Sequence, residues 1–255
     1  MTYGGPNHEH PLVHLIAGPT GVGKSATATA LARATGAPIV VADRLQCFTD
    51  IATTSARAGA DVPGVRRHWL GDRTFADGDL SAANATDALV GLVNQLGSRH
   101  PSVIVEGGSI SLLRELAGRL PQLPWELTVQ LLPLPDLDAY VATLTGRAHT
   151  MLAPPPPDRS LLEELDALWR DPRQRWLAAS VNGFEAVLEC CAKYGIDVDT
   201  IADGRLPDDV LARMAALIGE RHAEHGVLQY GVFTTLFEDW ITPKETGKSV
   251  AECVA

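Results

Sequence analysis

The first half of the chain alternates between short apolar runs and longer segments whose apolar residues recur every three or four positions. The runs have the length of buried strands, and they cover residues 12–17, 38–42, 102–105 and 127–134. The longer segments have helical spacing, and they cover residues 24–34, 81–97 and 109–120. Ser81 stands where the N-cap of the second helix is expected. This alternation of strand and helix predicts a parallel sheet flanked by helices.

The pattern changes after Pro135, where no further strand is expected. Helical segments are predicted at 136–152, 160–170, 183–194 and 206–225, and the four prolines at 154–157 interrupt them. We therefore expect an α/β domain over residues 11–135, followed by a smaller helical domain over 136–241 that acts as a lid or acceptor domain. The termini, 1–10 and 242–255, are predicted to be flexible.

Composition places the chain among water-soluble proteins with a buried core. It has 255 residues, of which 45% are hydrophobic. No apolar run approaches the about 18–20 residues that a membrane-spanning helix needs, and the N-terminus has no secretory signal pattern. The four cysteines show no metal-ligand spacing: Cys47, Cys190, Cys191 and Cys253. We expect a reduced, cytoplasmic protein without disulfides.

The net charge of −10 argues against a polynucleotide partner. Proteins that bind duplexes or tRNA usually present a basic face. Here the arginines are scattered, and Arg66–Arg67 is the single adjacent pair. Backbone amides and a few cations are enough to bind a small anion, so the charge favours a small phosphorylated ligand.

The segment Gly18–Ser25, GPTGVGKS, fits the phosphate-binding pattern G-x-x-x-x-G-K-[ST] between a predicted strand and a predicted helix. Gly18, Pro19, Gly21 and Gly23 would let backbone amides turn towards a diphosphate, and the helix start adds partial positive charge. Lys24 supplies a full charge, and the Ser25 hydroxyl is a candidate ligand for Mg²⁺. The alternative, a chance glycine-rich turn, does not account for the strand and helix on either side.

Acidic residues follow two of the predicted strands. A kinase or ATPase with such a loop usually has an aspartate after an apolar strand, whereas this chain has Glu106 there. Asp43 follows the strand at 38–42 and is placed to act as a general base beside the phosphate site. A structural ion pair or capping role is the alternative for Asp43.

With these residues the chain resembles the adenylate isopentenyltransferases, the bacterial cytokinin synthases related to tRNA dimethylallyltransferases. The motifs that carry the resemblance run in order over residues 12–230: GPTGVGKS at 18–25, DRLQC at 43–47, TTSAR at 53–57, WLGDR at 69–73, EGGSISLL at 106–113 and GRAHTML at 146–152. The P-loop is shared by many proteins, but the combination with DRLQC and EGGSISLL is far more specific. The resemblance implies transfer of a prenyl group from dimethylallyl diphosphate to the exocyclic amine of AMP.

The resemblance also implies roles for particular residues. Thr20 would donate a hydrogen bond to the bridging oxygen of the donor, and Asp43 would accept the proton of the amine. Lys24, Arg147 and Mg²⁺ would stabilise the leaving pyrophosphate. Ser55 would lie near the adenine.

Further positions are expected to bind substrate, and three of them have a structural alternative. They are Arg57, Gly108, Ser109, Ser111, Asn182 and His225. Ser109 and Ser111 have the alternative of capping a helix, and His225, matched to a histidine near the prenyl tail, has that of packing. Arg147 has the alternative of a solvated helix arginine.

One stretch departs from the family pattern, which often has Asp-Gly-Tyr-Arg where this chain has Asn182–Glu185. Asn182 lacks the charge of the family aspartate, and Glu185 puts a negative charge where the family has a positive one. The sequence leaves open AMP against ADP or ATP as acceptor, and a plain against a hydroxylated prenyl donor.

Two other functions remain compatible with the sequence. A tRNA dimethylallyltransferase shares the chemistry, although the acidic charge and the short chain count against it. A small-molecule kinase or regulatory ATPase would share the P-loop and consume ATP.

Overall fold

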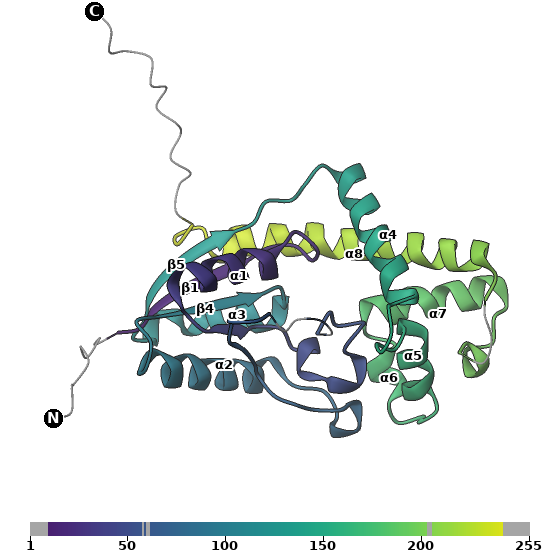
Figure 1. The fold of residues 1–255 in the computed structure, drawn as a ribbon, viewed down its shortest axis with the longest axis horizontal. Helices are drawn as coiled ribbons and strands as arrows, with labels where there is room; N and C mark the ends of the chain where they lie inside the picture. The colour runs from purple at the N-terminus through teal and green to yellow at the C-terminus, as the bar shows by residue number, and fades with distance from the viewer. Residues whose placement is uncertain (1–9, 58, 60–61, 203–205, 242–255) are drawn as a thin grey trace, which may run out of the picture.

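A computed structural model of the chain, shown in Figure 1, describes residues 10–57, 59, 62–202 and 206–241. The termini predicted to be flexible, 1–10 and 242–255, lie outside the described residues except for His10. Among the described helices, none is both long and apolar enough to cross a bilayer.

The centre of the molecule is a five-stranded sheet with the order β3-β2-β4-β1-β5. Every neighbouring pair in it is parallel. Its strands are β1 (Leu12–Ala17), β2 (Ile39–Val41), β3 (Arg67–Trp69), β4 (Ser102–Gly107) and β5 (Glu126–Leu131). The predicted α/β class is confirmed. The short strand β3 was not predicted, because its sequence, Arg-His-Trp, has no apolar run.

Helices cover both faces of this sheet. They are α1 (Lys24–Thr35), α2 (Ala82–Gly97) and α3 (Ile110–Arg119). Ala28 and Ala32 of α1 pack with Ile16 and Ile104 on one face. Because side chains alternate along a strand, the neighbours of Ile16 and Ile104 point to the other face, where α2 and α3 pack. Ser81 caps α2 as predicted, accepting from the Asn84 N–H at 3.1 Å.

The second half of the chain is helical, as predicted. It contains α4 (Leu137–Leu152), α5 (Leu161–Trp169), α6 (Arg175–Ala178), α7 (Asn182–Tyr194) and α8 (Asp208–Leu236). Short 3₁₀ turns lie at Leu45–Cys47, Thr49–Ile51, Phe75–Asp77, Leu120–Gln122 and Val198–Thr200.

The last of the described helices, α8, packs against both halves of the molecule. It has 29 residues and continues well past the predicted end at His225. Figure 1 shows it running from α7 along α4 and back to the sheet. Phe233 and Phe237 are fully buried in the core cluster that also contains residues of the sheet, α2 and α3, and Ile241 forms a parallel bridge with Val129. The domain boundary at 135–136 stays a prediction. Helix α8 belongs to the predicted helical domain, but its end packs against the α/β domain.

Candidate active site

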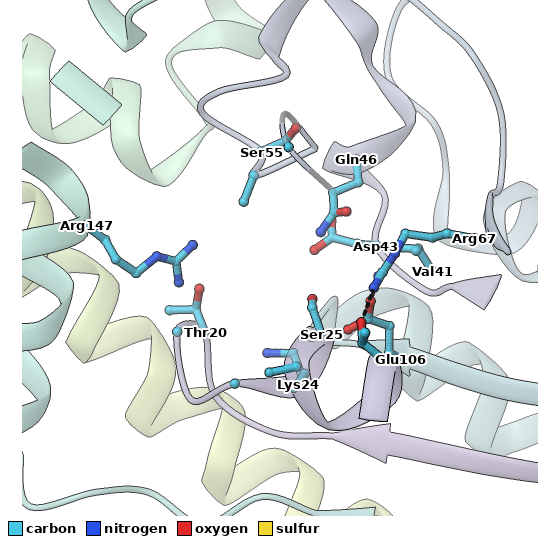
Figure 2. A pocket seen from close by; sticks show the side chains of 18 of the residues that line it. Thr20, Lys24, Ser25, Val41, Asp43, Gln46, Ser55, Arg67, Glu106 and Arg147 are labelled. Atoms are coloured by element: carbon cyan, nitrogen blue, oxygen red, sulfur yellow. Dashed lines mark hydrogen bonds and ion pairs between the residues drawn. The ribbon is translucent and has the colours of Figure 1, made fainter. Parts of the chain in front are cut away.

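A cavity of about 750 Å³ opens at the carboxyl end of the sheet, where ligands bind in open α/β folds. The P-loop after β1, the segment after β2 and the end of β4 form one side, and α4 and α8 form the other. The predicted residues that line it are Thr20, Gly21, Gly23, Lys24, Ser25, Asp43, Ser55, Gly108 and Arg147. Figure 2 shows Lys24, Asp43, Thr20 and Arg147 around this common space.

The P-loop wraps around the Lys24 ammonium. Its Nζ donates to the carbonyls of Gly18 at 3.0 Å and Pro19 at 2.6 Å. Gly21 and Gly23 have φ angles of 74° and 95°, a region that favours glycine. Burial lowers the pKa of Lys24 to about 8; the carboxylate of Asp43 opposes this shift and the Arg147 charge adds to it. With this pKa, Lys24 stays mostly charged at neutral pH and loses its charge as the pH rises above about 8.

Asp43 stands at the end of β2, opposite the P-loop (Figure 2). Its Oδ1 accepts from the Leu45 N–H at 2.9 Å, which fixes the carboxylate. Burial raises the pKa of Asp43, while the Leu45 hydrogen bond and the Lys24 charge lower it. A buried carboxylate with a raised pKa is suited to accepting a proton near neutral pH.

Arg147 reaches the cavity from α4 and faces Thr20 in Figure 2. Burial lowers its pKa from the ordinary arginine value, yet a guanidinium remains charged in proteins. The cavity thus has cations on two sides, Lys24 from α1 and Arg147 from α4. This arrangement suits an anion with more than one phosphate.

The turn at Thr53–Ala56 carries Ser55 to the cavity wall. Within the described structure, the buried Ser55 hydroxyl has no hydrogen-bond partner, so it is available to a ligand. The turn is held by Glu164 of α5, which accepts from the Thr53 N–H at 2.8 Å, the Thr54 N–H at 2.9 Å and the Thr54 hydroxyl at 2.7 Å. Burial raises the pKa of Glu164.

Arg57, predicted to bind substrate, connects three of the motifs instead of lining the cavity. Its guanidinium donates to the carbonyl of Gln46 at 2.8 Å and pairs with Asp72. It also stacks over the Trp69 ring, 4.7 Å from the centroid. These contacts join the TTSAR, DRLQC and WLGDR segments.

Ser109 and Ser111 flank the start of α3 and are not among the residues that line the cavity. Ser109 occupies the N-cap position but makes no capping hydrogen bond. Ser111 accepts from Arg44 Nη1 at 2.9 Å. Gly18 and Pro19 contribute through the carbonyls that hold Lys24.

Asn182 and His225 lie near the cavity but outside its lining set. Asn182 begins α7, and a Cβ placed on the adjacent Gly183 would lie 3.5 Å from Thr54 Cγ2. The stretch that departs from the family pattern, Asn182–Glu185, therefore lies next to the Thr53–Ala56 turn. Burial lowers the pKa of His225, and the charges of Asp43 and Lys24 act on it, the first raising and the second lowering the pKa.

Several contributors were not predicted from the sequence. His222, three residues before His225 and on the same helix face, lines the cavity; the spacing of the two histidines was a usable signal. Arg67 of β3 and Glu106 of β4 form a buried ion pair at the cavity wall (Figure 2). Glu106 is thus engaged by an arginine of a strand that the sequence did not reveal.

No group of three or more His, Cys, Asp or Glu side chains suited to a metal ion occurs in the part of the chain that the structure describes. The candidate metal ligand is Ser25, whose hydroxyl faces the cavity. A single protein oxygen together with substrate phosphates is a usual way of binding Mg²⁺.

Comparison with known proteins supports the resemblance seen in the motifs. The family model described as isopentenyl transferase matches residues 11–242. The chain belongs to the isopentenyl transferase family. Similar relatives include an adenylate dimethylallyltransferase of Rhodococcoides fascians, 41% identical over 228 residues, which are 89% of each chain. One of Ralstonia solanacearum is 30% identical over 89% of this chain and 96% of its own.

Solved structures show the same isopentenyl transferase fold. A tRNA isopentenylpyrophosphate transferase of Bacillus halodurans has a TM-score of 0.64 and 13% identity, covering 88% of this chain and 87% of its own. A eukaryotic dimethylallyltransferase acting on tRNA has a TM-score of 0.65 and 15% identity, covering 91% and 73%. This chain therefore shares its fold with enzymes whose names refer to tRNA.

Proposed function

We propose that this isopentenyl transferase moves a dimethylallyl group from dimethylallyl diphosphate to the exocyclic amine of an adenine nucleotide, the first step of cytokinin biosynthesis. The relatives with high identity are named for this reaction. The observation that carries the proposal is the cavity itself, where a P-loop with two cations faces the carboxylate of Asp43.

The diphosphate of the donor binds to the P-loop, with Lys24 and Arg147 at its sides. The bond between the prenyl carbon and the bridging oxygen breaks, and pyrophosphate leaves with the electron pair. The Thr20 hydroxyl, directed into the cavity in Figure 2, donates a hydrogen bond to that oxygen as charge grows on it. His225 borders the prenyl chain.

The acceptor adenine lies between Asp43 and the Thr53–Ala56 turn. Its exocyclic nitrogen forms the new bond to the prenyl carbon and loses a proton to Asp43. An aromatic amine is a weak nucleophile because its lone pair is delocalised into the ring, so removal of the proton as the bond forms speeds the reaction. The Ser55 hydroxyl, which lacks a partner within the described residues, hydrogen-bonds the adenine.

The metal proposed for this site is Mg²⁺, bound by the Ser25 hydroxyl and by oxygens of the donor diphosphate. The oxygen ligands fit the preference of Mg²⁺. When bound, it neutralises charge on the diphosphate. Lys24 and Arg147 supply the remaining positive charge from the protein.

A direct assay tests the function. Purified protein is incubated with Mg²⁺, dimethylallyl diphosphate or its hydroxylated analogue, and AMP, ADP or ATP in turn, and nucleotides are analysed by mass. We expect a nucleotide heavier by one prenyl group, formed about 10²–10⁴-fold more slowly by an Asp43→Asn variant prepared in parallel. Hydrolysis of ATP without any prenylated product would establish the kinase or ATPase alternative instead.

Modification of tRNA is the second candidate, because the structural neighbours act on tRNA. The net charge of −10 favours the small acceptor. A parallel reaction with total tRNA, digested to nucleosides after incubation, separates the two. Prenylated adenosine in the tRNA digest with none in the free nucleotides would reverse the assignment.

A further inference from the structure

Gln229 of α8 lies beneath the active site and bridges two of the loops that form it. Its side chain is buried, with 4% exposed. Its Oε1 accepts from the Thr20 N–H at 2.7 Å, and its Nε2 donates to the Gly108 carbonyl at 2.6 Å. One amide therefore connects the P-loop to the loop after β4, and uses both its donor and its acceptor to do so.

The opposite side of Thr20 is held by a second side chain. The Tyr140 hydroxyl of α4 donates to the Thr20 carbonyl at 2.6 Å, and Tyr140 is itself buried. It reaches that position because α8 has Gly226 at the crossing, where a Cβ would overlap the Tyr140 hydroxyl. The backbone N–H and carbonyl of Thr20 are thus tied to α8 and α4 respectively.

This arrangement differs from the usual task of a P-loop, in which backbone N–H groups turn towards the phosphate. The Thr20 N–H points to Gln229, so Thr20 contributes its side chain to the cavity and not its amide. With both backbone groups fixed, the direction of the Cα–Cβ bond is fixed as well. Figure 2 shows the resulting hydroxyl between Arg147 and Lys24, where a diphosphate would lie.

We propose that Gln229 is a positioning residue that sets the Thr20 hydroxyl against the bridging oxygen of the prenyl diphosphate. The inference rests on the proposed function for its chemistry and on the two hydrogen bonds of Gln229 for its geometry. A misplacement of about 1 Å at a reacting group costs up to about a hundredfold in rate. Gln229 acts through Thr20 and does not touch the substrate.

The test is a double-mutant cycle on kcat between Gln229→Met and Thr20→Val. Gln229→Met preserves length and removes both hydrogen bonds, and we expect kcat to fall by about tenfold to a hundredfold with little change in the acceptor KM. In the Thr20→Val background the same change should cost less than about twofold, because the hydroxyl that it positions is already absent. Equal losses in both backgrounds would overturn the proposal.

Two control variants separate positioning from general loss of stability. Phe233→Leu, one turn further along α8 in the core, should lower the melting temperature and leave kcat unchanged. Gln95→Met makes the same exchange at an exposed site on α2 and should change neither. Tyr140→Phe covers the case in which Gln229→Met fails to fold: it removes one hydroxyl and should lower kcat only when Thr20 is present.

Hydrogen exchange of the Thr20 amide provides a measurement independent of catalysis. The amide should be protected in the wild type and should exchange at least tenfold faster in Gln229→Met. In Tyr140→Phe its exchange should also be faster, but by a smaller factor. Unchanged exchange in Gln229→Met would refute the positioning role even if activity falls. If the wild type forms no prenylated nucleotide but the amide is protected, the proposed function fails and the contact itself stands.

Discussion

Raising the pH from 7 to 9 is expected to weaken binding of the prenyl diphosphate through deprotonation of Lys24. Burial lowers the pKa of this ammonium to about 8 in the free protein. A diphosphate next to the ammonium favours the charged form and raises the pKa again. Binding is therefore coupled to uptake of a proton, and the affinity falls as the proton becomes scarcer.

The size of the effect follows from the pKa. With a value of about 8, about nine-tenths of the molecules carry the Lys24 charge at pH 7 and about one-tenth at pH 9. Binding that requires the charge then weakens by about tenfold, or about 1.4 kcal/mol. A lysine with an ordinary pKa of about 10.4 would stay charged over the whole range and give almost no change.

Calorimetric titration with dimethylallyl diphosphate at pH 7, 8 and 9 measures this dependence, and buffers of different ionisation enthalpy report the protons taken up. Lys24→Arg is the matched control, because a guanidinium stays charged throughout and the variant still shows any contribution from ionisation of the ligand. An affinity that is flat between pH 7 and 9 in the wild type, or that falls equally in Lys24→Arg, would refute the reasoning.

Three further predictions concern single substitutions. Asp43→Asn should lower kcat by about 10²–10⁴-fold while donor affinity is kept. Burial raises the folded-state pKa of Asp43, so its charge at pH 7 opposes folding and the variant should also melt at a higher temperature. A large loss of donor affinity would instead indicate a metal-binding role. Gly226→Ala should destabilise the protein by about 1–3 kcal/mol in urea unfolding, because the added methyl group overlaps Tyr140. Gly231→Ala, on the same helix with nothing within 4 Å, should stabilise it by up to about 1 kcal/mol. Equal effects of the two substitutions would contradict the close packing of Tyr140 against Gly226. Glu164→Gln should cost about 1–3 kcal/mol, because the amide nitrogen must face a backbone N–H donor, and should raise the acceptor KM several-fold in initial-rate assays; an unchanged acceptor KM would mean that Glu164 does not position the acceptor side.

Local patterns were sufficient to predict most of the fold. The buried strands appeared as apolar runs, and the P-loop and Asp43 appeared at strand ends. The strand β3 was not predicted, because its residues Arg67–Trp69 are only partly buried and form no apolar run. The helix α8 was predicted too short because Gly231 and β-branched residues weaken its local propensity, whereas packing of Phe233 in the core sustains it.

The candidate site likewise contains residues that local motifs predict and residues that only the tertiary packing brings together. Thr20, Lys24 and Asp43 belong to short motifs whose chemistry is visible locally, although their roles remain predictions. Gln229 meets Thr20 across 209 residues of sequence, and Glu164 meets Thr53 across 111 residues. No periodicity or short motif encodes such a pairing, because it depends on how helices cross.

The contact between Gln229 and Thr20 has a consequence for the order in which the protein can mature. A chain emerging from the ribosome presents its N-terminal strands and P-loop first. Thr20 then awaits a partner made 209 residues later, and joining segments so distant carries a loop-closure cost that must be met before the contact contributes. A nascent or truncated chain that ends before α8 therefore has the phosphate-binding loop without its final restraint. Under the role proposed for Gln229, full catalytic competence requires that α8 has docked, so an intact α8 is a condition for activity as well as for stability.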